Sequence, residues 1–251
     1  MKNLKSRLIM FVLLVGLVFS GYKIVDYFYT SYDEKQNFNN VEKLVESEYE
    51  DEKIQYNDFE ILKKYKKVYE KNNDLVGWIK IKDTNIDYPV MQTKDDYSYY
   101  LKRNFNKKYS IYGTPFVGEG CGINPNSDNV IIYGHNMKNG RMFAPLMKFK
   151  NKECFNKHQI IEFITPNEKA IYHIVCVAKV KSDDSWYSFI ENSGESHYNE
   201  KIKELYSKSL YHSDYEFGYD DEFLTLSTCE YSQNDGRLIV VAVKEGANSN
   251  V

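Results

Sequence analysis

Phe223-Leu-Thr-Leu-Ser-Thr-Cys229 is a short apolar run that predicts a buried β-strand ending on a cysteine. Polar and small residues follow at once, and a second apolar run, 237–243, begins with Arg237. Two such runs joined by a short polar loop are typical of a hairpin. The stretch therefore predicts a thiol at the end of one strand and a guanidinium at the start of its neighbour. Loops held by rigid strands often carry function.

A cysteine reacts as a nucleophile through its thiolate, so it needs a partner that handles the proton. The best candidate lies far upstream, where the apolar run 129–133 leads into Gly134-His135. Catalytic partners meet in space and need not be close in sequence. Cys229, His135 and Arg237 are therefore the candidate catalytic residues, each at one end of a predicted strand.

Each of these three residues also has a structural interpretation. A lone cysteine at a strand end is often a small buried hydrophobic residue. A histidine after a glycine can cap a turn, and an arginine that opens a strand can be a surface charge. The combination of all three at strand ends favours catalysis over these separate explanations.

The chemistry suited to this set is acyl transfer. Cys229 would attack a carbonyl carbon and form a thioester, which reacts readily with amines. His135 would give a proton to the leaving amine and take one from the incoming nucleophile. Arg237 keeps its charge at neutral pH, so it would hold the substrate and stabilise the oxyanion.

Composition excludes several other classes of protein. The chain has 251 residues, enough for one sizeable domain, and a formal net charge of -3. It lacks a basic stripe with interleaved aromatic residues, which argues against nucleic-acid binding. No two of its four cysteines form a C-x-x-C pair, which argues against zinc, although a disulfide between Cys121 and Cys154 stays open. The glycines at 118, 120 and 122 lack nucleotide-binding spacing, which argues against a nucleotide site. No cluster of carboxylates is evident, so we expect no metal and no other cofactor.

The N-terminal segment predicts membrane insertion. Residues 8–22 carry no charge and follow three basic residues. This run is shorter than the roughly 18 to 20 residues of a spanning helix, but apolar residues over 24–29 extend it, and Lys23 can snorkel. A signal peptide cleaved near 18–20 is one interpretation, and an uncleaved anchor with a cytoplasmic basic end is the other. The apolar residues beyond 20 favour the anchor, and both interpretations place the main domain outside the cytoplasm.

Three regions are predicted along the chain: an anchor over 1–30, a charged spacer and helical extension over 31–74, and a β-rich domain over 75–251. Residues 31–56 are highly charged, which predicts a solvated spacer or an exposed helix. Asn57 and Glu60 resemble a capping box, and apolar residues at 59, 62, 65 and 69 predict a helix after it. An insertion over 182–222 contains a second helical stripe, formed by Tyr198, Ile202, Leu205 and Tyr206. The many short strands predict a mainly β fold, a barrel or a sandwich.

Three pieces of this sequence resemble the sortases, membrane-anchored cysteine transpeptidases of Gram-positive bacteria. They are Thr225-Leu-Ser-Thr-Cys229, the strand end Tyr133-Gly-His135, and Arg237 eight positions after the cysteine. The strand pattern over 75–244 and the N-terminal apolar segment are similar as well. The resemblance implies a closed sortase-type β-barrel. It also implies that Cys229 is the nucleophile, His135 the general acid and base, and Arg237 the group that stabilises substrate and oxyanion.

Within that family the chain looks like class B, because of the helical extension before Leu75 and the helix-bearing insertion before the Cys229 strand. The resemblance implies cleavage of a C-terminal sorting signal of secreted proteins after Thr, at an NPQTN-like or related motif. The acyl group would pass to an amine of peptidoglycan or of its lipid-linked precursor. The enzyme would be a single-pass protein of the cell membrane with an extracellular catalytic domain and no nucleic-acid partner.

Further substrate contacts are expected at Ser227, at Glu230 and over residues 186–190. Two other functions remain open at this stage. The first is a thiol peptidase that only hydrolyses its thioester. The second is a surface-anchored binding module without catalysis.

Overall fold

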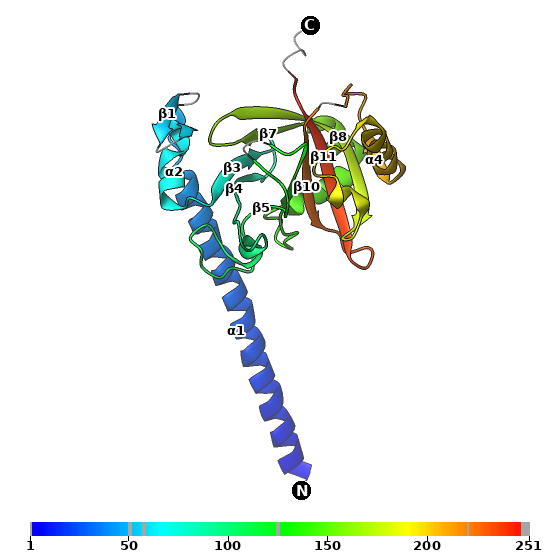
Figure 1. Ribbon diagram of the computed structural model, residues 1–251. Coiled ribbons are helices and arrows are strands. Elements are labelled where there is room, and N and C mark those ends of the chain that lie inside the picture. Colours follow the sequence, from blue (N-terminus) through cyan, green and yellow to red (C-terminus); the bar gives the residue numbers. More distant parts are fainter. Residues whose placement is uncertain (1, 50–51, 57–58, 124–125, 220, 247–251) are drawn as a thin grey trace. The chain divides into compact units, whose positions relative to one another are not determined.

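The computed structural model describes residues 2–49, 52–56, 59–123, 126–219 and 221–246. The chain divides into two compact units, Met1–Glu42 and Lys43–Val251. The first unit is one α-helix, α1 (Lys2–Glu42). The second unit holds the strands and the remaining helices (Figure 1).

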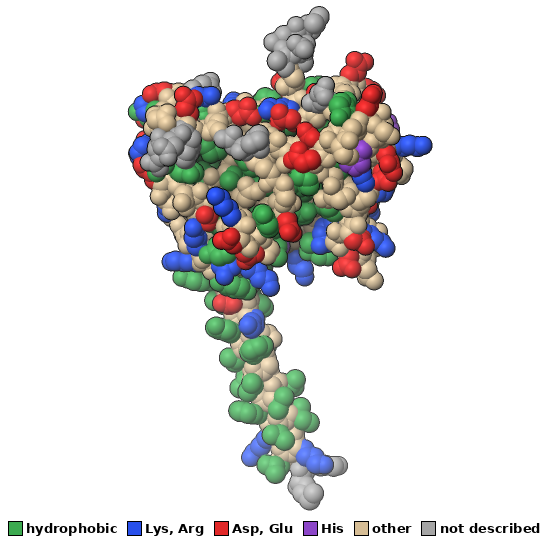
Figure 2. Space-filling model, in the orientation of Figure 1, with side chains coloured by type: hydrophobic (Ala, Val, Ile, Leu, Met, Phe, Trp, Pro, Cys, Tyr) green, Lys and Arg blue, Asp and Glu red, His purple; other side chains and the backbone are tan. Residues whose placement is uncertain are grey.

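Helix α1 is long and apolar enough to cross a membrane. Its part from Leu4 to Glu42 has a mean hydropathy of 2.3 in the most apolar window. Figure 2 shows apolar side chains along much of the helix and basic side chains at its N-terminal end. The helix continues past residue 30 to Glu42. For residues 31–56 we expected either a solvated spacer or an exposed helix, and the part up to Glu42 is helical.

The predicted helix over residues 57–71 is wrong in its first half. Phe59–Leu62 form strand β2, which pairs antiparallel with β1 (Lys53–Tyr56), and Asn57 lies outside the described residues. Leu62 also donates its backbone N–H to the carbonyl of Pro166. These partners occupy the backbone groups that a helix would use, so pairing overrides the local helical period. Helical structure begins only at η2 (Lys63–Tyr65) and α2 (Lys66–Lys71).

Eight strands of the second unit form a closed barrel, as the resemblance to the sortases implied, which excludes the sandwich that the strand pattern alone left open. Their order is β11-β10-β6-β5-β4-β3-β7-β8, and β8 pairs with β11 to close the ring. Closure leaves no free edge within the ring. A ninth strand, β9 (Ser209–His212), pairs with β8. The barrel strands are β3 (Leu75–Lys80), β4 (Asp87–Met91), β5 (Phe116–Val117), β6 (Asn129–Tyr133), β7 (Ile160–Ile164), β8 (Lys169–Lys181), β10 (Phe223–Cys229) and β11 (Gly236–Lys244).

Short helices precede or connect the strands. Most are single turns of 3₁₀ helix or short α-helices, and α4, in the insertion, is longer. They are η1 (Ser47–Tyr49), η3 (Tyr99–Lys102), η4 (Ala144–Lys150), α3 (Lys152–Lys157), η5 (Ser185–Ser188) and α4 (Glu195–Ser207).

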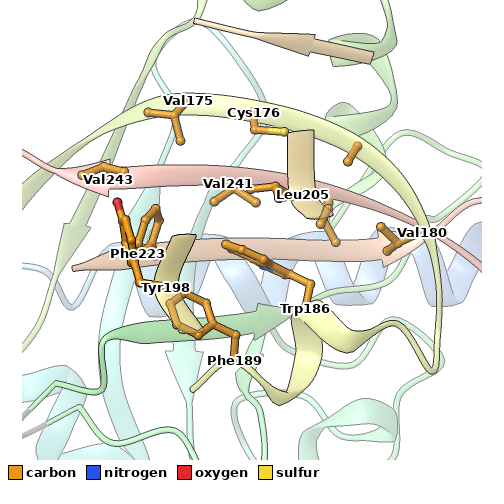
Figure 3. Close-up of a cluster of buried hydrophobic side chains, with 12 residues drawn as sticks. Val175, Cys176, Val180, Trp186, Phe189, Tyr198, Leu205, Phe223, Val241 and Val243 are labelled. Atoms are coloured by element: carbon orange, nitrogen blue, oxygen red, sulfur yellow. The ribbon is translucent and has the colours of Figure 1, made fainter. Parts of the chain in front are cut away.

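The insertion between β8 and β10 packs on one face of the barrel wall. Figure 3 shows Trp186, within η5, and Phe189, directly after it, beside Phe223 of β10 and Val241 of β11. Helix α4 adds buried Tyr198 and Leu205 to the same cluster, while Ile202 and Tyr206 are partly buried against it. The predicted helical stripe is therefore confirmed. Each large side chain fully buried in this way contributes about 1.5–3 kcal/mol, so the layer holds the insertion firmly on β10 and β11.

Candidate active site

Strand β10 lies between β6 and β11, and its pairing places the three candidate residues in one row. Cys229 is paired with Arg237 in the antiparallel ladder with β11. On the other side, Ser227 is paired with Tyr133 in the parallel ladder with β6. The N–H of Gly134 continues that ladder to the carbonyl of Ser227, at 3.1 Å.

The register extends from this pair to the catalytic candidates. Cys229 lies two residues beyond Ser227 on the same face of β10, since side chains alternate along a strand. His135 lies two residues beyond Tyr133, just past the end of β6. Arg237 points to that face as well, because paired residues of a ladder share a side. The row His135, Cys229, Arg237 therefore ends three adjacent strands at the same end of the barrel.

Two hydrogen bonds hold the ends of β6 and β10 together beside this row. Asn136 donates from Nδ2 to the carbonyl oxygen of Cys229 at 2.8 Å. Thr228 donates from Oγ1 to the carbonyl oxygen of Gly134 at 2.7 Å. The backbone on both sides of His135 and Cys229 is thus fixed by side chains that neighbour the catalytic candidates.

Gly134 is required by close packing. A Cβ at this position would lie 2.5 Å from the ring of Phe143. Phe143 in turn donates its backbone N–H to the carbonyl of His135 at 2.9 Å. A glycine therefore precedes His135 because the Phe143 ring packs directly against the backbone at this position.

The His135 ring is held by a backbone carbonyl. Its Nε2 lies 2.7 Å from the carbonyl oxygen of Leu101, which can only accept a hydrogen bond, so Nε2 carries a proton. In the neutral ring Nδ1 is then the nitrogen that can receive a proton. Within the described residues the ring makes this bond and none to Cys229. Catalytic hydrogen bonds often tighten only when substrate is bound.

Arg237 follows a glycine that the loop requires. A Cβ on Gly236 would lie 2.3 Å from the carbonyl oxygen of Glu230. Gly236 accepts a hydrogen bond from the N–H of Glu230 at 2.9 Å and another from Nη1 of Arg237 at 3.0 Å. The hairpin therefore closes tightly behind Cys229 and leaves the arginine half-buried at the edge of the row.

An aromatic wall flanks the row on the side of the insertion. The Tyr187 hydroxyl is 2.7 Å from Oγ of Ser227, and its ring stacks on Tyr133 with 5.8 Å between centroids. Phe116 extends the stack at 5.7 Å from Tyr133. Burial raises the pKa of Tyr187 to about 12, against the opposing effects of the hydrogen bond with Ser227 and of the Arg237 charge, so its hydroxyl stays neutral at physiological pH. The wall therefore presents neutral rings and hydroxyl groups to the face that carries Cys229.

Glu230 is only 2% exposed and is bound within the chain. Its carboxylate accepts hydrogen bonds from Nζ of Lys150 at 2.9 Å and from the backbone and side chain of Ser232. Burial opposes its ionisation, but the hydrogen bonds from Ser232 and Lys150 outweigh this and lower the pKa to about 2. The ionised side chain thus anchors the loop that follows Cys229.

The structure brings the predicted residues together, and it adds others that the sequence did not indicate. Leu101 and Asn136 were missed. Asn136 directly follows His135, but its bond to Cys229 depends on the β6–β10 pairing, and Leu101 acts through a backbone atom that no side-chain pattern reveals. Cys121 and Cys154 are free thiols, so the disulfide left open is not formed. Across the described ranges, no three His, Cys, Asp or Glu side chains converge as a metal site requires.

A family model of the sortase domain matches residues 79–245. The chain is 30% identical to sortase B of Staphylococcus aureus over 241 residues, 94% of each chain. It is 33% identical to sortase B of Listeria monocytogenes over 173 residues, 67% of this chain and 69% of that one. Among solved structures, sortase B from Bacillus anthracis superposes with a TM-score of 0.75 at 28% identity, covering 86% of this chain and 98% of that chain. Sortase B of Clostridium perfringens gives a TM-score of 0.67 at 36% identity, with 72% and 99% coverage.

Replacing Gly134 with alanine is expected to lower the free energy of unfolding by about 1–3 kcal/mol, because the new methyl group overlaps the Phe143 ring. Denaturant unfolding of the purified protein measures this. Gly218→Ala is the matched control, since a Cβ there meets open space and the change should stay within about 0.5 kcal/mol. Equal stability of the two variants would contradict the packing argument.

Glu230→Gln keeps the shape of the side chain and removes its charge. The pKa of Glu230 is lower in the folded state, about 2 against an ordinary 4.5, so its ionisation stabilises the fold above pH 4.5. That stabilisation is lost as the pH falls towards 2. The variant should be less stable at pH 7 by about 3 kcal/mol, and the difference from wild type should shrink steadily below pH 4.5.

Denaturant unfolding at several pH values tests this dependence. Glu200→Gln, an exposed position on α4, is the control and should change the stability by less than about 0.5 kcal/mol at any pH. A loss for Glu230→Gln that is the same at pH 7 and pH 2.5 would show that the carboxylate charge is not what stabilises the loop.

Proposed function

Because this chain belongs to the sortase family, as a class B member and a cysteine transpeptidase, we propose that it anchors secreted proteins to the cell wall from the membrane surface. The observation that carries the proposal is the row of His135, Cys229 and Arg237 across β6, β10 and β11. It combines a nucleophile, a proton carrier and a permanent cation at one end of the barrel. We assign catalysis to these three residues.

The first half of the reaction forms a thioester. The Cys229 thiolate attacks the carbonyl carbon of the Thr residue in a C-terminal sorting signal, and the carbonyl oxygen becomes an oxyanion. Arg237 stabilises that charge with donors fixed in a plane. The carbon–nitrogen bond then breaks, and protonated His135 gives its proton to the leaving amine.

The second half transfers the acyl group. An amine of peptidoglycan or of its lipid-linked precursor attacks the thioester carbon, and His135 takes a proton from that nitrogen. The oxyanion forms again beside Arg237 and collapses, which releases the Cys229 thiolate and leaves a new amide bond. Atoms and charge balance without a cofactor, since the proton given in the first half is recovered in the second.

The sorting signal is proposed to be an NPQTN-like or related peptide that binds beside the aromatic wall. Ser227 and residues 186–190 are the proposed contacts. The Ser227 hydroxyl is bonded to Tyr187, so a peptide reaches it only by replacing or sharing that bond. The Glu230 carboxylate is already satisfied by Lys150 and Ser232, so a contact of Glu230 with substrate would require the loop after Cys229 to rearrange.

We further propose that α1 anchors the protein in the cell membrane and that the catalytic domain is extracellular. The length and composition of α1 support a spanning segment, and the basic residues at its N-terminal end favour a cytoplasmic location for that end. On this proposal residues 1–30 are the anchor, residues 31–74 a spacer and extension, and residues 75–251 the catalytic domain.

Cleavage of a panel of fluorogenic sorting-signal peptides by the full-length protein in detergent tests the proposal. We expect Cys229→Ala to abolish cleavage, and Arg237→Ala to lower kcat about 10²–10³-fold because an oxyanion donor is lost. His135→Ala should lower it about 10²–10⁴-fold. With triglycine present, mass spectrometry should find the amine joined to the released Thr carboxyl group.

Matched controls are available for two of these changes. His158 also bonds to a backbone carbonyl, that of Lys82 at 3.1 Å, but it lies outside the row, and Cys154 is half-buried like Cys229. His158→Ala and Cys154→Ala should retain cleavage. Cleavage without any amine adduct would identify a hydrolase, and cleavage that survives Cys229→Ala would refute the mechanism.

A further inference from the structure

Polar side chains interrupt the apolar face that the insertion covers. Phe223 on β10 and Ile239, Val241 and Val243 on β11 belong to the apolar cluster under the insertion. Thr225, on the same face of β10, and Asn129, at the start of β6, are buried there with no exposed surface. Burying such groups is costly unless each is hydrogen-bonded.

These groups form a hydrogen-bond chain that runs in one direction. Trp186 donates from Nε1 to Oγ1 of Thr225 at 3.0 Å. Thr225 donates its hydroxyl hydrogen to Oδ1 of Asn129 at 2.8 Å. Asn129 donates from Nδ2 to the carbonyl of Phe189 at 2.8 Å and from its backbone N–H to the carbonyl of Ile190 at 3.0 Å. An indole N–H can only donate and a carbonyl can only accept, so the chain has one possible orientation.

The chain begins and ends on the same short segment, residues 186–190. That segment carries Tyr187, whose hydroxyl bonds to Ser227, the residue two positions before Cys229 on the same face. Apolar packing alone is not directional. The hydrogen bonds from Trp186 and to Phe189 therefore fix where the segment sits along β10, and with it where Tyr187 stands relative to the row.

We propose that the buried chain Trp186–Thr225–Asn129 is a positioning device that holds Tyr187 and its segment beside Cys229. It sets how tightly the sorting peptide binds and leaves the intrinsic reactivity of the cysteine unchanged. The claim about peptide affinity rests on the proposed function. The claim about position does not, and it is measured separately.

Hydrogen exchange on the full-length protein in detergent tests the position of the segment. Thr225→Val removes the hydroxyl and keeps the branched shape, whereas Thr225→Ser keeps the hydroxyl. Amides of residues 185–190 should exchange at least tenfold faster in Thr225→Val than in Thr225→Ser, while those of α4 keep their protection. Trp186→Phe removes the donor at the start of the hydrogen-bond chain and should speed the exchange of the same amides. This variant replaces Thr225→Val in the test if Thr225→Val does not fold.

Val241→Ala separates positioning from general stability. Val241 is paired with Thr225 across the β10–β11 ladder and lies in the same apolar cluster, but its side chain takes no part in the hydrogen-bond chain. This variant should lower the melting temperature without faster exchange over 185–190. Equal exchange in Thr225→Val and Thr225→Ser, or equally fast exchange in Val241→Ala, would overturn the proposal.

Kinetics test the link to binding. With a fluorogenic NPQTN peptide, Thr225→Val should raise KM at least fivefold and keep kcat within twofold, and Thr225→Ser should restore KM. The rate at which iodoacetamide alkylates Cys229 should stay within twofold in all variants. An unchanged KM, or an alkylation rate that falls with it, would refute the assigned role. Failure of the wild type to cleave any peptide would instead count against the proposed function, and the exchange data would still decide the position of the segment.

Discussion

The parallel pairing of β6 with β10 is the constraint on which the site depends. These strands are separated by about ninety residues of chain, yet their register decides which residue of β10 lies next to the segment that carries His135. A slip of one residue would turn every side chain of β10 to the opposite face, because the side-chain period of a strand is two. The hydrogen bonds of Thr228 to Gly134 and of Asn136 to Cys229 lie where the register matters most, at the strand ends. Closure of the barrel through β8 and β11 holds β10 from the other side.

Much of this arrangement could be predicted from local patterns. The apolar runs that became β6, β10 and β11, the polar loop between the last two, and the residues Cys229, His135 and Arg237 at their ends are all visible in the sequence. The helical stripe of α4 is visible for the same reason, since one face of that helix packs on the barrel. What these elements share is that burial of one face imposes a period on the sequence.

The features that could not be predicted depend on partners distant in the chain. Residues 59–62 have a helical spacing of apolar side chains but pair with β1 and bond to Pro166, so long-range pairing decided their structure. From the sequence, Glu230 is a candidate substrate contact beside the cysteine, yet Lys150, eighty residues away, binds its carboxylate in the interior. Leu101 holds the His135 ring through its backbone carbonyl, a group that every residue carries. None of these contacts leaves a pattern in the segment where it acts.

One face of β10 shows how the covering layer and the reactive site depend on each other. Along this face Phe223, Thr225 and Ser227 are at most 1% exposed, whereas Cys229 is half-buried. The change occurs next to Tyr187, whose hydroxyl bonds to Ser227, so this residue marks where the cover ends. A shift of the insertion along β10 would separate the Tyr187 hydroxyl from Ser227. Apolar contacts alone permit such a shift at little cost. The shift would, however, break the buried hydrogen bonds that join residues 186–190 to β6 and β10. The position of Tyr187 beside Ser227 therefore depends on polar groups buried beneath the insertion as well as on the apolar packing around them.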